Sequence, residues 1–224
     1  MKRVLIACEC SGVVRRAFRD TGFDAWSCDI KPAEDRSEFH YQCDCREILR
    51  NDWDFLGTHP DCTFLTNSAA WAFKDGPYHQ KVKPGTLVGQ ARRDARRLAL
   101  DFVELLLDAP VPLIYLENPI GAINTEIRKP DQIIHPWQFG DDASKATCLW
   151  LKGLPLLSQL DGEPVVPRYV EIDGKLVPRW GNQTDSGQNK LTPSDGRAAE
   201  RSRTYEGIAR AMVRCWGKIL NGDA

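Results

Sequence analysis

The chain has 224 residues, enough for one domain with a sizeable core, and it balances 30 lysine and arginine residues against 31 aspartate and glutamate residues, for a formal net charge of −1. A molecule this close to neutral has no overall field that would draw it to nucleic acid or to acidic lipid, so any nucleic-acid surface has to be local. No run approaches the roughly 18 apolar residues of a membrane helix, and the short apolar run at the N-terminus does not suit a secretion signal.

The first half of the chain alternates short apolar runs with helical patterns. Strands are expected at residues 3–8, 23–30, 40–49, 53–59 and 111–116. Helices are expected at residues 13–22 and 91–107, where apolar positions recur at helical spacing. Strands separated by helices indicate an α/β fold with a mostly parallel sheet.

The second half follows a different pattern. Two runs, residues 132–140 and 145–154, are expected to form an antiparallel edge of the sheet. Residues 155–200 are rich in proline, glycine and polar residues, with one hairpin signal where Asp173-Gly174 joins two apolar-polar runs. An amphipathic helix is expected over residues 203–220. The whole chain, residues 1–224, is interpreted as a single cytoplasmic domain.

Ligands of open α/β sheets bind at the carboxyl ends of the strands. Candidate residues follow five of the expected strands: Glu9 to Gly12, Asp29, Asp44, Cys62, and Glu117 with Asn118. We therefore expect the fold to bring these residues to one edge of the sheet.

The turn after the first strand is a candidate cofactor site. It leaves a strand and enters a helix, where free backbone N–H groups and Gly12 let a ligand approach closely, although a plain tight turn is the alternative. Asp29 lies 17 residues beyond Gly12, near the spacing of about 20 at which an acid binds ribose hydroxyls. Together they favour a nucleoside-containing cofactor. Asp44 would meet an adenine amino group or cap the helix that follows.

Cys62 is the candidate nucleophile. Most free cysteines are small buried hydrophobes, and only a lowered pKa makes one a useful nucleophile. This one follows Pro60 and Asp61 at a strand end and precedes a polar loop. His59 suggests a Cys-His hydrolase as an alternative, but no nucleophile elbow is present.

Glu117 closes an apolar run, where a carboxylate is partly desolvated. An acid at such a place can hold a ring nitrogen and an exocyclic amine together, as in the recognition of a cytosine edge. Asn118 is better suited than Glu117 to capping a helix.

Four cysteines form two Cys-x-Cys pairs, Cys8 with Cys10 and Cys43 with Cys45. Such pairs could bind zinc or an iron–sulfur cluster, but the usual spacing is Cys-x2-Cys. Reduced, buried thiols are favoured over disulfides or a metal, and no metal is expected.

These features together resemble the DNA cytosine-C5 methyltransferases. The resemblance rests on Pro-x-Cys after the fourth strand, Glu-Asn-Pro after the fifth, a small-residue turn after the first, and acids after the second and third. It is strongest to small phage-type and prophage-type members, through the segments HPDCTFLTNS, LENPIG, KATCLWLKGLP and ERSRTYEGIARAM. It implies a Rossmann-like methyltransferase fold, with helices on both faces of the sheet and S-adenosylmethionine as methyl donor.

The resemblance also implies roles for individual residues. The catalytic residues would be Cys62, Glu117, Asn118 and Lys145. The cofactor would contact Cys8, Glu9, Cys10, Ser11, Gly12, Asp29, Ile30, Asp44, Cys45 and Pro60. The substrate would contact Asp61, Thr63, Asn67, Ser68, Pro119 and Thr147.

The implied reaction starts with addition of the Cys62 thiolate to C6 of cytosine, while Glu117 stabilises N3 and the amino group. In DNA the base has to be flipped out of the duplex or be single-stranded. The group transferred could be a plain or a modified methyl.

Three departures from larger members leave alternatives open. Asp61 separates the usual Pro-Cys pair. The usual Gln-x-Arg-x-Arg is missing, so that Lys145 or Thr147 would contact the base instead. The target-recognition domain is absent or reduced to residues 155–200. The alternatives are a free pyrimidine nucleotide such as dCMP as substrate, or a catalytically silent DNA-binding relative.

Residues 67–90 mix basic and aromatic side chains, a composition that suits phosphate contact and base stacking. They are Lys74, Lys81 and Lys83 with Trp71, Phe73 and Tyr78. The arginines that follow, Arg92, Arg93, Arg96 and Arg97, would continue this basic stretch, or form a solvated helix face that pairs with Asp94 and Asp101.

Overall fold

The computed structural model describes residues 1–158, 164–191, 200 and 202–222. Its elements in chain order are β1 (Arg3–Ala7), α1 (Val13–Asp20), β2 (Asp24–Asp29), β3 (His40–Gln42), η1 (Cys45–Glu47), β4 (Phe55–Thr58), η2 (Ala70–Phe73), α2 (Gly89–Leu107), β5 (Leu113–Pro119), α3 (Ile123–Glu126), β6 (Gln132–Ile134), η3 (Pro136–Phe139), β7 (Thr147–Lys152), β8 (Arg168–Ile172), β9 (Lys175–Arg179) and α5 (Glu206–Asn221), where η marks a 3₁₀ helix.

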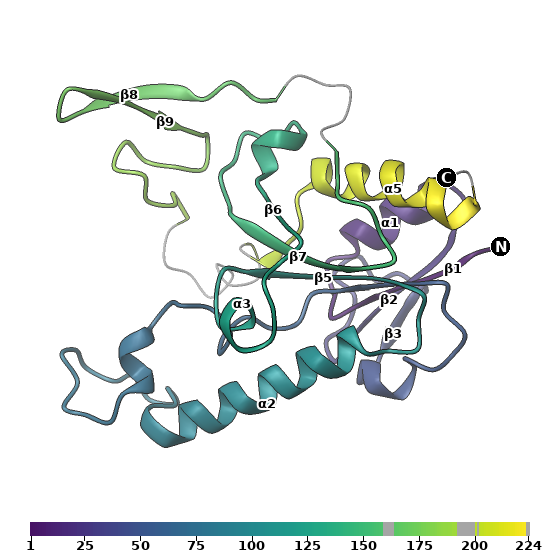
Figure 1. Cartoon of the computed structure of the whole chain (residues 1–224), viewed down its shortest axis with the longest axis horizontal. Helices are drawn as coiled ribbons and strands as arrows, with labels where there is room; N and C mark the ends of the chain where they lie inside the picture. The colour runs from purple at the N-terminus through teal and green to yellow at the C-terminus, as the bar shows by residue number, and fades with distance from the viewer. Residues whose placement is uncertain (159–163, 192–199, 201, 223–224) are drawn as a thin grey trace.

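Seven strands form one mixed sheet in the order β3-β2-β1-β4-β5-β7-β6 (Figure 1). Strands β1 to β5 pair in parallel, whereas β7 is antiparallel to β5 and to β6. The order 3-2-1-4-5 is that of a doubly wound open sheet. The predicted α/β fold, with a mostly parallel sheet and an antiparallel edge, is confirmed. The carboxyl ends of the five parallel strands lie along a single edge.

Helices cover both faces of this sheet, as the alternation of strand side chains requires. Val4 and Ile6 of β1 pack on the face covered by α1 and α5, together with Trp216. Leu5 packs on the opposite face with residues of α2, among them Leu106. No helix in the described ranges is both long and apolar enough to cross a membrane.

Two predicted strands are shorter than expected. The strand predicted at residues 40–49 ends at Gln42, because Asp44 accepts a hydrogen bond from the Arg46 amide and begins η1. The strand predicted at residues 132–140 ends at Ile134, and η3 begins at Pro136. Proline has no N–H to donate to a ladder but suits the first turn of a helix.

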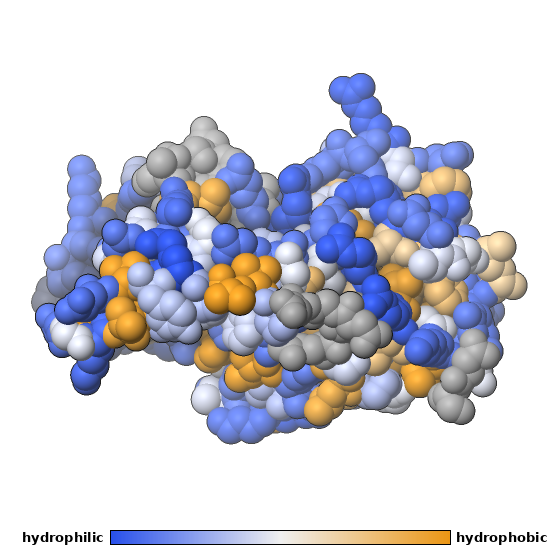
Figure 2. Space-filling model, turned by 90° about the horizontal axis from the view of Figure 1, so that it is seen from above, coloured by the Kyte–Doolittle hydropathy of each residue, from blue (hydrophilic) through white to orange (hydrophobic). Residues whose placement is uncertain are grey.

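Strands β8 and β9 form a separate two-stranded sheet that projects from the body (Figure 1). Its turn is the predicted one, because Asp173 and Gly174 both have positive φ, at 49° and 73°. Tyr169 and Leu176 on this hairpin are 59% and 71% exposed. In Figure 2 hydrophobic residues stand among hydrophilic ones at the end of the molecule where the hairpin lies. Of the expected insert 155–200, residues 159–163 and 192–199 lie outside the described residues.

Candidate functional site

The turn between β1 and α1 is held by the carboxylate of Glu9. This side chain is 5% exposed and accepts hydrogen bonds from the amides of Val14 at 2.8 Å and Arg15 at 3.3 Å. It thereby satisfies two amides of the first helical turn, which have no partner within the helix. The side chain of Glu9 is occupied in this way, so a ligand would meet the backbone of the turn and Ser11.

Gly12 is required at this turn by its conformation and by the space around it. Its φ is +68°, and a Cβ there would lie 2.3 Å from the Arg15 guanidinium. Cys8 at the start of the turn also has a positive φ, of 60°. The backbone from Cys8 to Gly12 thus bends sharply away from β1, as the sequence predicted.

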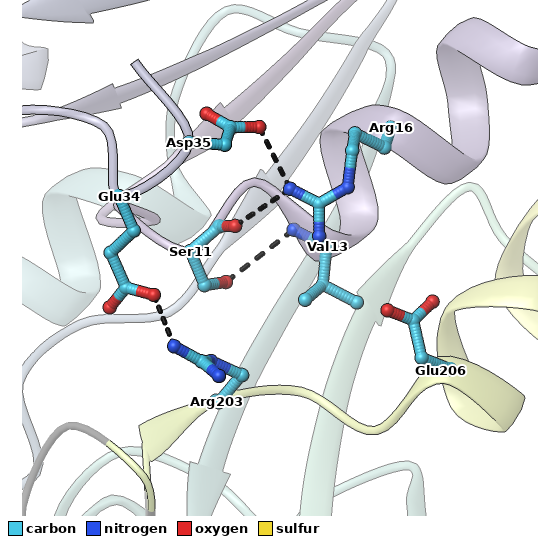
Figure 3. Close-up of a pocket in the computed structure, with 7 residues that line it drawn as sticks. All are labelled: Ser11, Val13, Arg16, Glu34, Asp35, Arg203 and Glu206. Carbon is cyan, nitrogen blue, oxygen red and sulfur yellow. Dashed lines mark hydrogen bonds and ion pairs between the residues drawn. The ribbon is translucent and has the colours of Figure 1, made fainter. Parts of the chain in front are cut away.

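A pocket of about 240 Å³ opens beside this turn (Figure 3). Its lining residues come from three places in the chain and carry both signs of charge: Ser11, Val13, Arg16, Glu34, Asp35, Arg203 and Glu206. Arg16 donates to the Ser11 carbonyl at 3.0 Å and to Asp35 at 2.8 Å, and Arg203 pairs with Glu34. Ser11 is the only predicted cofactor residue in this lining. Arg203 and Glu206 lie in the segment ERSRTYEGIARAM, whereas no sequence signal indicated Glu34 or Asp35.

The remaining predicted cofactor residues lie at neighbouring strand ends. Asp29 ends β2 and accepts a hydrogen bond from the Lys31 amide at 2.9 Å. Ile30, next to it, is 73% exposed. Pro60 follows β4, and its carbonyl accepts a hydrogen bond from the Asn118 side chain.

Asp44 is engaged locally. Its carboxylate accepts from the Arg46 amide and from Arg46 Nε, both at 3.0 Å, and these hydrogen bonds lower the pKa of Asp44. The capping role that the sequence offered as an alternative is therefore present, and an adenine contact stays a prediction.

The thiols near this end pack against one another. Cys28 Sγ lies 3.7 Å from Cys43 Sγ, and Cys8 hydrogen-bonds with Cys45, while Cys10 lies near Glu34. In the described ranges no three His, Cys, Asp or Glu side chains form a group that could hold a metal ion.

Cys62 begins a tight turn directly after β4. Its carbonyl accepts from the amides of Leu65 at 3.0 Å and Thr66 at 2.9 Å. Before it, the Asp61 carboxylate accepts from the amide and hydroxyl of Thr63, at 2.9 and 2.7 Å. Asp61 therefore stabilises the turn that presents the half-buried Cys62 thiol.

The surroundings of Cys62 keep its thiol protonated. Burial raises the pKa of Cys62, the charges of Asp61 and Glu117 raise it further, and the Lys145 ammonium and a backbone hydrogen bond oppose them only in part. The Cys62 thiol, the Glu117 carboxylate and the Lys145 ammonium are therefore close enough to interact electrostatically.

Glu117 lies on β5 and is 8% exposed. Burial alone would raise the pKa of its carboxyl group, but Lys145, His59 and the Thr147 hydroxyl outweigh that effect, so the pKa is lowered. A buried charge that keeps such partners remains ionised at neutral pH. His59 Nδ1 lies 3.1 Å from Glu117 Oε2, a contact that sequence reasoning missed.

Asn118 ties the two strand ends together. Its side-chain amide donates to the Pro60 carbonyl at 2.8 Å, and it lies within β5 rather than at a helix cap. Its buried Oδ1 has no hydrogen-bond partner among the residues that the structure describes. Pro119 and Thr147, two predicted substrate contacts, pair across β5 and β7.

The loop after Cys62 keeps its basic residues in solvent. Asn67, Ser68 and the three lysines, Lys74, Lys81 and Lys83, are exposed. Trp71 packs edge-on against Tyr78 and His79, with ring centroids 5.7 and 5.8 Å apart. Contact of this loop with phosphate or with bases stays a prediction.

Three of the four arginines at the start of α2 contact the preceding chain rather than Asp94 or Asp101, and their contact with nucleic acid stays a prediction. Arg92 donates to the Thr63 carbonyl at 3.2 Å, and Arg96 donates to the carbonyls of Phe64 at 2.8 Å and Thr66 at 3.3 Å. Arg93 donates to the Phe73 carbonyl and pairs with Asp75, and the aspartates of α2 are not their partners in the described residues. These arginines hold the chain that follows Cys62.

Comparison with known proteins finds solved structures that are distant in sequence. No protein-family model and no curated protein matches the chain. A structure described as a DNA modification methyltransferase encoded within an Escherichia coli prophage is 15% identical with a TM-score of 0.47, covering 74% of this chain and 53% of its own. The Schizosaccharomyces pombe Dnmt2 methyltransferase is 15% identical with a TM-score of 0.41, covering 73% and 53%. The chain spans about half the length of either structure.

Proposed function

We propose that this chain is an S-adenosylmethionine-dependent methyltransferase that acts on C5 of cytosine in DNA through a covalent Cys62 adduct. The observation that carries the proposal is the grouping of Cys62, Glu117 and Lys145, whose charges interact at the carboxyl edge of the sheet. A thiol beside a buried, ionised carboxylate and a cation suits addition to a ring whose nitrogen and amine must be held at the same time.

The residues at the β1 and β2 ends fit the proposed donor. An exposed apolar Ile30 beside the Asp29 carboxylate suits an adenosine, whose ring stacks while its ribose hydroxyls donate hydrogen bonds. The pocket beside Ser11, lined by both signs of charge, suits an amino-acid group with an ammonium and a carboxylate (Figure 3). When bound, S-adenosylmethionine would supply an electrophilic methyl group.

The chain's own residues would supply the activation of cytosine. C5 is a weak nucleophile, so Cys62 adds as a thiolate at C6, and the electron pair of the C5–C6 double bond becomes available at C5. A proton taken up from solvent at N3 balances the charge of the added thiolate, and the ionised Glu117 accepts hydrogen bonds from N3–H and the exocyclic amine, with Lys145 beside it. N3 returns this proton to solvent when the thiolate leaves. After C5 has been methylated, loss of the C5 proton restores the double bond and expels the Cys62 thiolate.

Two segments support DNA as the substrate. The loop with Lys74, Lys81 and Lys83 directly follows Cys62, and the β8–β9 hairpin projects past the same end of the sheet (Figure 1). A two-stranded ribbon and a basic-aromatic loop are both common devices for contacting nucleic acid. The base would reach Cys62 flipped out of a duplex or from a single strand.

The proposal is tested by incubating the protein with labelled S-adenosylmethionine and DNA, then digesting the DNA to nucleosides. The expected product is labelled 5-methylcytosine, and Cys62→Ser should abolish it. Label in N4-methylcytosine or methyladenine would contradict the proposed mechanism. Offering dCMP beside DNA separates a DNA enzyme from one that acts on free nucleotides.

A second candidate, a catalytically silent DNA-binding protein, is favoured by one observation, the raised pKa of Cys62. Duplex DNA that contains 5-fluorocytosine separates the two, because the fluorine cannot leave as the C5 proton does. An active Cys62 should form a stable covalent adduct in the presence of the methyl donor. A silent binder retains the DNA only non-covalently.

A further inference from the structure

His59 lies between the side chains of Glu117 and Tyr115, two residues of β5. Its Nδ1 is 3.1 Å from Glu117 Oε2, and its Nε2 is 2.8 Å from the Tyr115 hydroxyl oxygen. The side chains of His59 and Glu117 are 9% and 11% exposed, and Tyr115 is fully buried. Both ring nitrogens therefore have partners inside the protein, and these partners fix the ring.

The register of β4 and β5 builds this arrangement. Gly57 pairs with Tyr115, so His59, two residues later, comes level with Glu117 on the same face of the sheet. A Cβ on Gly57 would lie 2.4 Å from the Tyr115 ring and 2.7 Å from its hydroxyl oxygen. The absence of a side chain at Gly57 lets the phenol lie across β4 and reach the imidazole.

The direction of the hydrogen bonds follows from the partners. Burial raises the pKa of Tyr115, and the charges of Glu9 and Glu117 raise it further, so Tyr115 is a neutral phenol. Because the ionised Glu117 can only accept, Nδ1 of His59 must carry a hydrogen. Nε2 lies 2.8 Å from the Tyr115 hydroxyl oxygen, which has no other hydrogen bond within the described ranges. The imidazole is therefore held at both nitrogens, and its Nδ1–H donates to Glu117.

We infer that His59 is a positioning residue for Glu117, and that its Nδ1–H hydrogen bond fixes the orientation in which the carboxylate meets the base. The inference rests on the proposed role of Glu117 in holding cytosine. With Oε2 bound to His59, the carboxylate cannot rotate freely, and its other oxygen is left for the exocyclic amine. An error of 1 Å in placing a group that contacts the reacting base costs about 100-fold in rate.

Two isosteric variants separate positioning from general packing. In His59→Asn the amide nitrogen can take the place of Nδ1 and donate to Glu117. In His59→Gln the amide nitrogen takes the place of Nε2, nearer Tyr115. His59→Leu has no side-chain donor at either position. The rate of adduct formation with 5-fluorocytosine DNA is expected to fall about 100-fold in His59→Leu and His59→Gln, and to recover largely in His59→Asn.

A second measurement does not depend on activity. Carbon NMR of protein labelled in the glutamate carboxyl groups reports the titration of Glu117, assigned with Glu117→Gln. His59→Leu should raise the pKa of Glu117, because it removes the hydrogen bond to the carboxylate, whereas His59→Asn should keep that pKa low. Lys145 is present in all variants and so does not account for a difference between them. Melting temperatures of the variants show whether each is folded, and the Asn and Gln pair keeps the test decisive if the Leu variant does not fold.

The outcomes for this inference and for the proposed function can be told apart. If the parent protein forms no adduct, the proposed function fails, and the titration of Glu117 still shows whether His59 controls this carboxylate. If the parent forms the adduct and the His59 variants match its rate, the inference is overturned while the function stands. An Asn variant no better than the Gln variant, in both rate and titration, overturns it as well.

Discussion

Cys62 is surrounded by more negative than positive charge. Burial, Asp61 and Glu117 all raise its pKa, and among the charged groups Lys145 lowers it. The thiolate is the reactive form of cysteine, so the free protein holds its candidate nucleophile in the unreactive form at neutral pH. Reactivity should rise with pH, and a substrate that offsets the charge of Glu117 would favour the thiolate.

Asp61→Asn should increase the reactivity of Cys62. The amide removes a charge that raises the pKa of the thiol, while its oxygen can still accept the two hydrogen bonds from Thr63. We expect the rate of alkylation of Cys62 by iodoacetamide at neutral pH to rise about threefold, the size of effect of one partly screened charge. Mass spectrometry of the Cys62 peptide separates this thiol from the other seven. An unchanged or slower rate would show that Asp61 acts through the turn alone.

At the scale of elements, α2 and the turn after β4 form one unit. Arg92 and Arg96 donate to carbonyls of residues 63–66, and both guanidinium groups lie over the Phe73 ring, at 4.7 and 3.5 Å from its centroid. A tight turn leaves carbonyls without backbone partners, and buried carbonyls need donors. Planar guanidinium groups supply several donors each and also stack on an aromatic ring.

Arg96→Ala should loosen the segment after Cys62. Two carbonyls lose their donor and Phe73 loses a stacking partner, so we expect a lower melting temperature and an increase of about tenfold in proteolytic cleavage within residues 66–88, equivalent to about 1.4 kcal/mol of local stability. Arg96→Lys should restore only part of this, because a lysine lacks the planar fork.

Arg97→Ala is the matched control on the same helix. Arg97 is exposed and has no recorded hydrogen bond or ion pair to another described residue. Cleavage in residues 66–88 should match the parent in this variant. Equal effects of the two alanine substitutions would show that helix charge, and not the contacts to the carbonyls, governs the segment.

At the scale of the molecule, the sheet and the hairpin are separate units. The β8–β9 hairpin forms its own two-stranded sheet within the described residues. The residues that directly follow β9 connect it to the body. The Trp180 ring stacks on Trp137 with centroids 5.5 Å apart, and the Gly181 amide donates to Asp142 at 2.7 Å. The hairpin can therefore change without disturbing the sheet edge that carries Cys62 and Glu117.

Replacing residues 168–179 with a short Gly-Ser turn should weaken duplex DNA binding while it spares the cofactor site. We expect about a tenfold loss of affinity at moderate salt, the effect of losing one or two phosphate contacts. Affinity for S-adenosylmethionine, measured by calorimetry, should stay the same. DNA affinity equal to that of the parent would show that the hairpin does not contact the duplex.

The sequence by itself determined the main strands and helices, their order and the sheet edge that gathers the candidate residues. Apolar periodicity is a local property, and the strand ends that carry Asp29 and Glu117 and that precede Cys62 could be read without the fold, although Glu117 lies within β5 rather than after it. The turn at Asp173 and Gly174 was predictable for the same reason, because positive φ at both positions favours these residue types. The strands at 40–49 and 132–140 were predicted too long, since Asp44 and Pro136 begin short helices there.

Only the tertiary structure decided which side chains are partners. His59 and Glu117 are 58 residues apart, and Arg96 and Phe64 are 32 apart. Such pairs depend on strand order, on register and on the helix that covers the turn. The pairing of Gly57 with Tyr115 is the clearest case, because it depends on β4 and β5 being neighbours in this register. Periodicity tells which face of a strand a residue occupies, and the packing of the chain selects what it meets there.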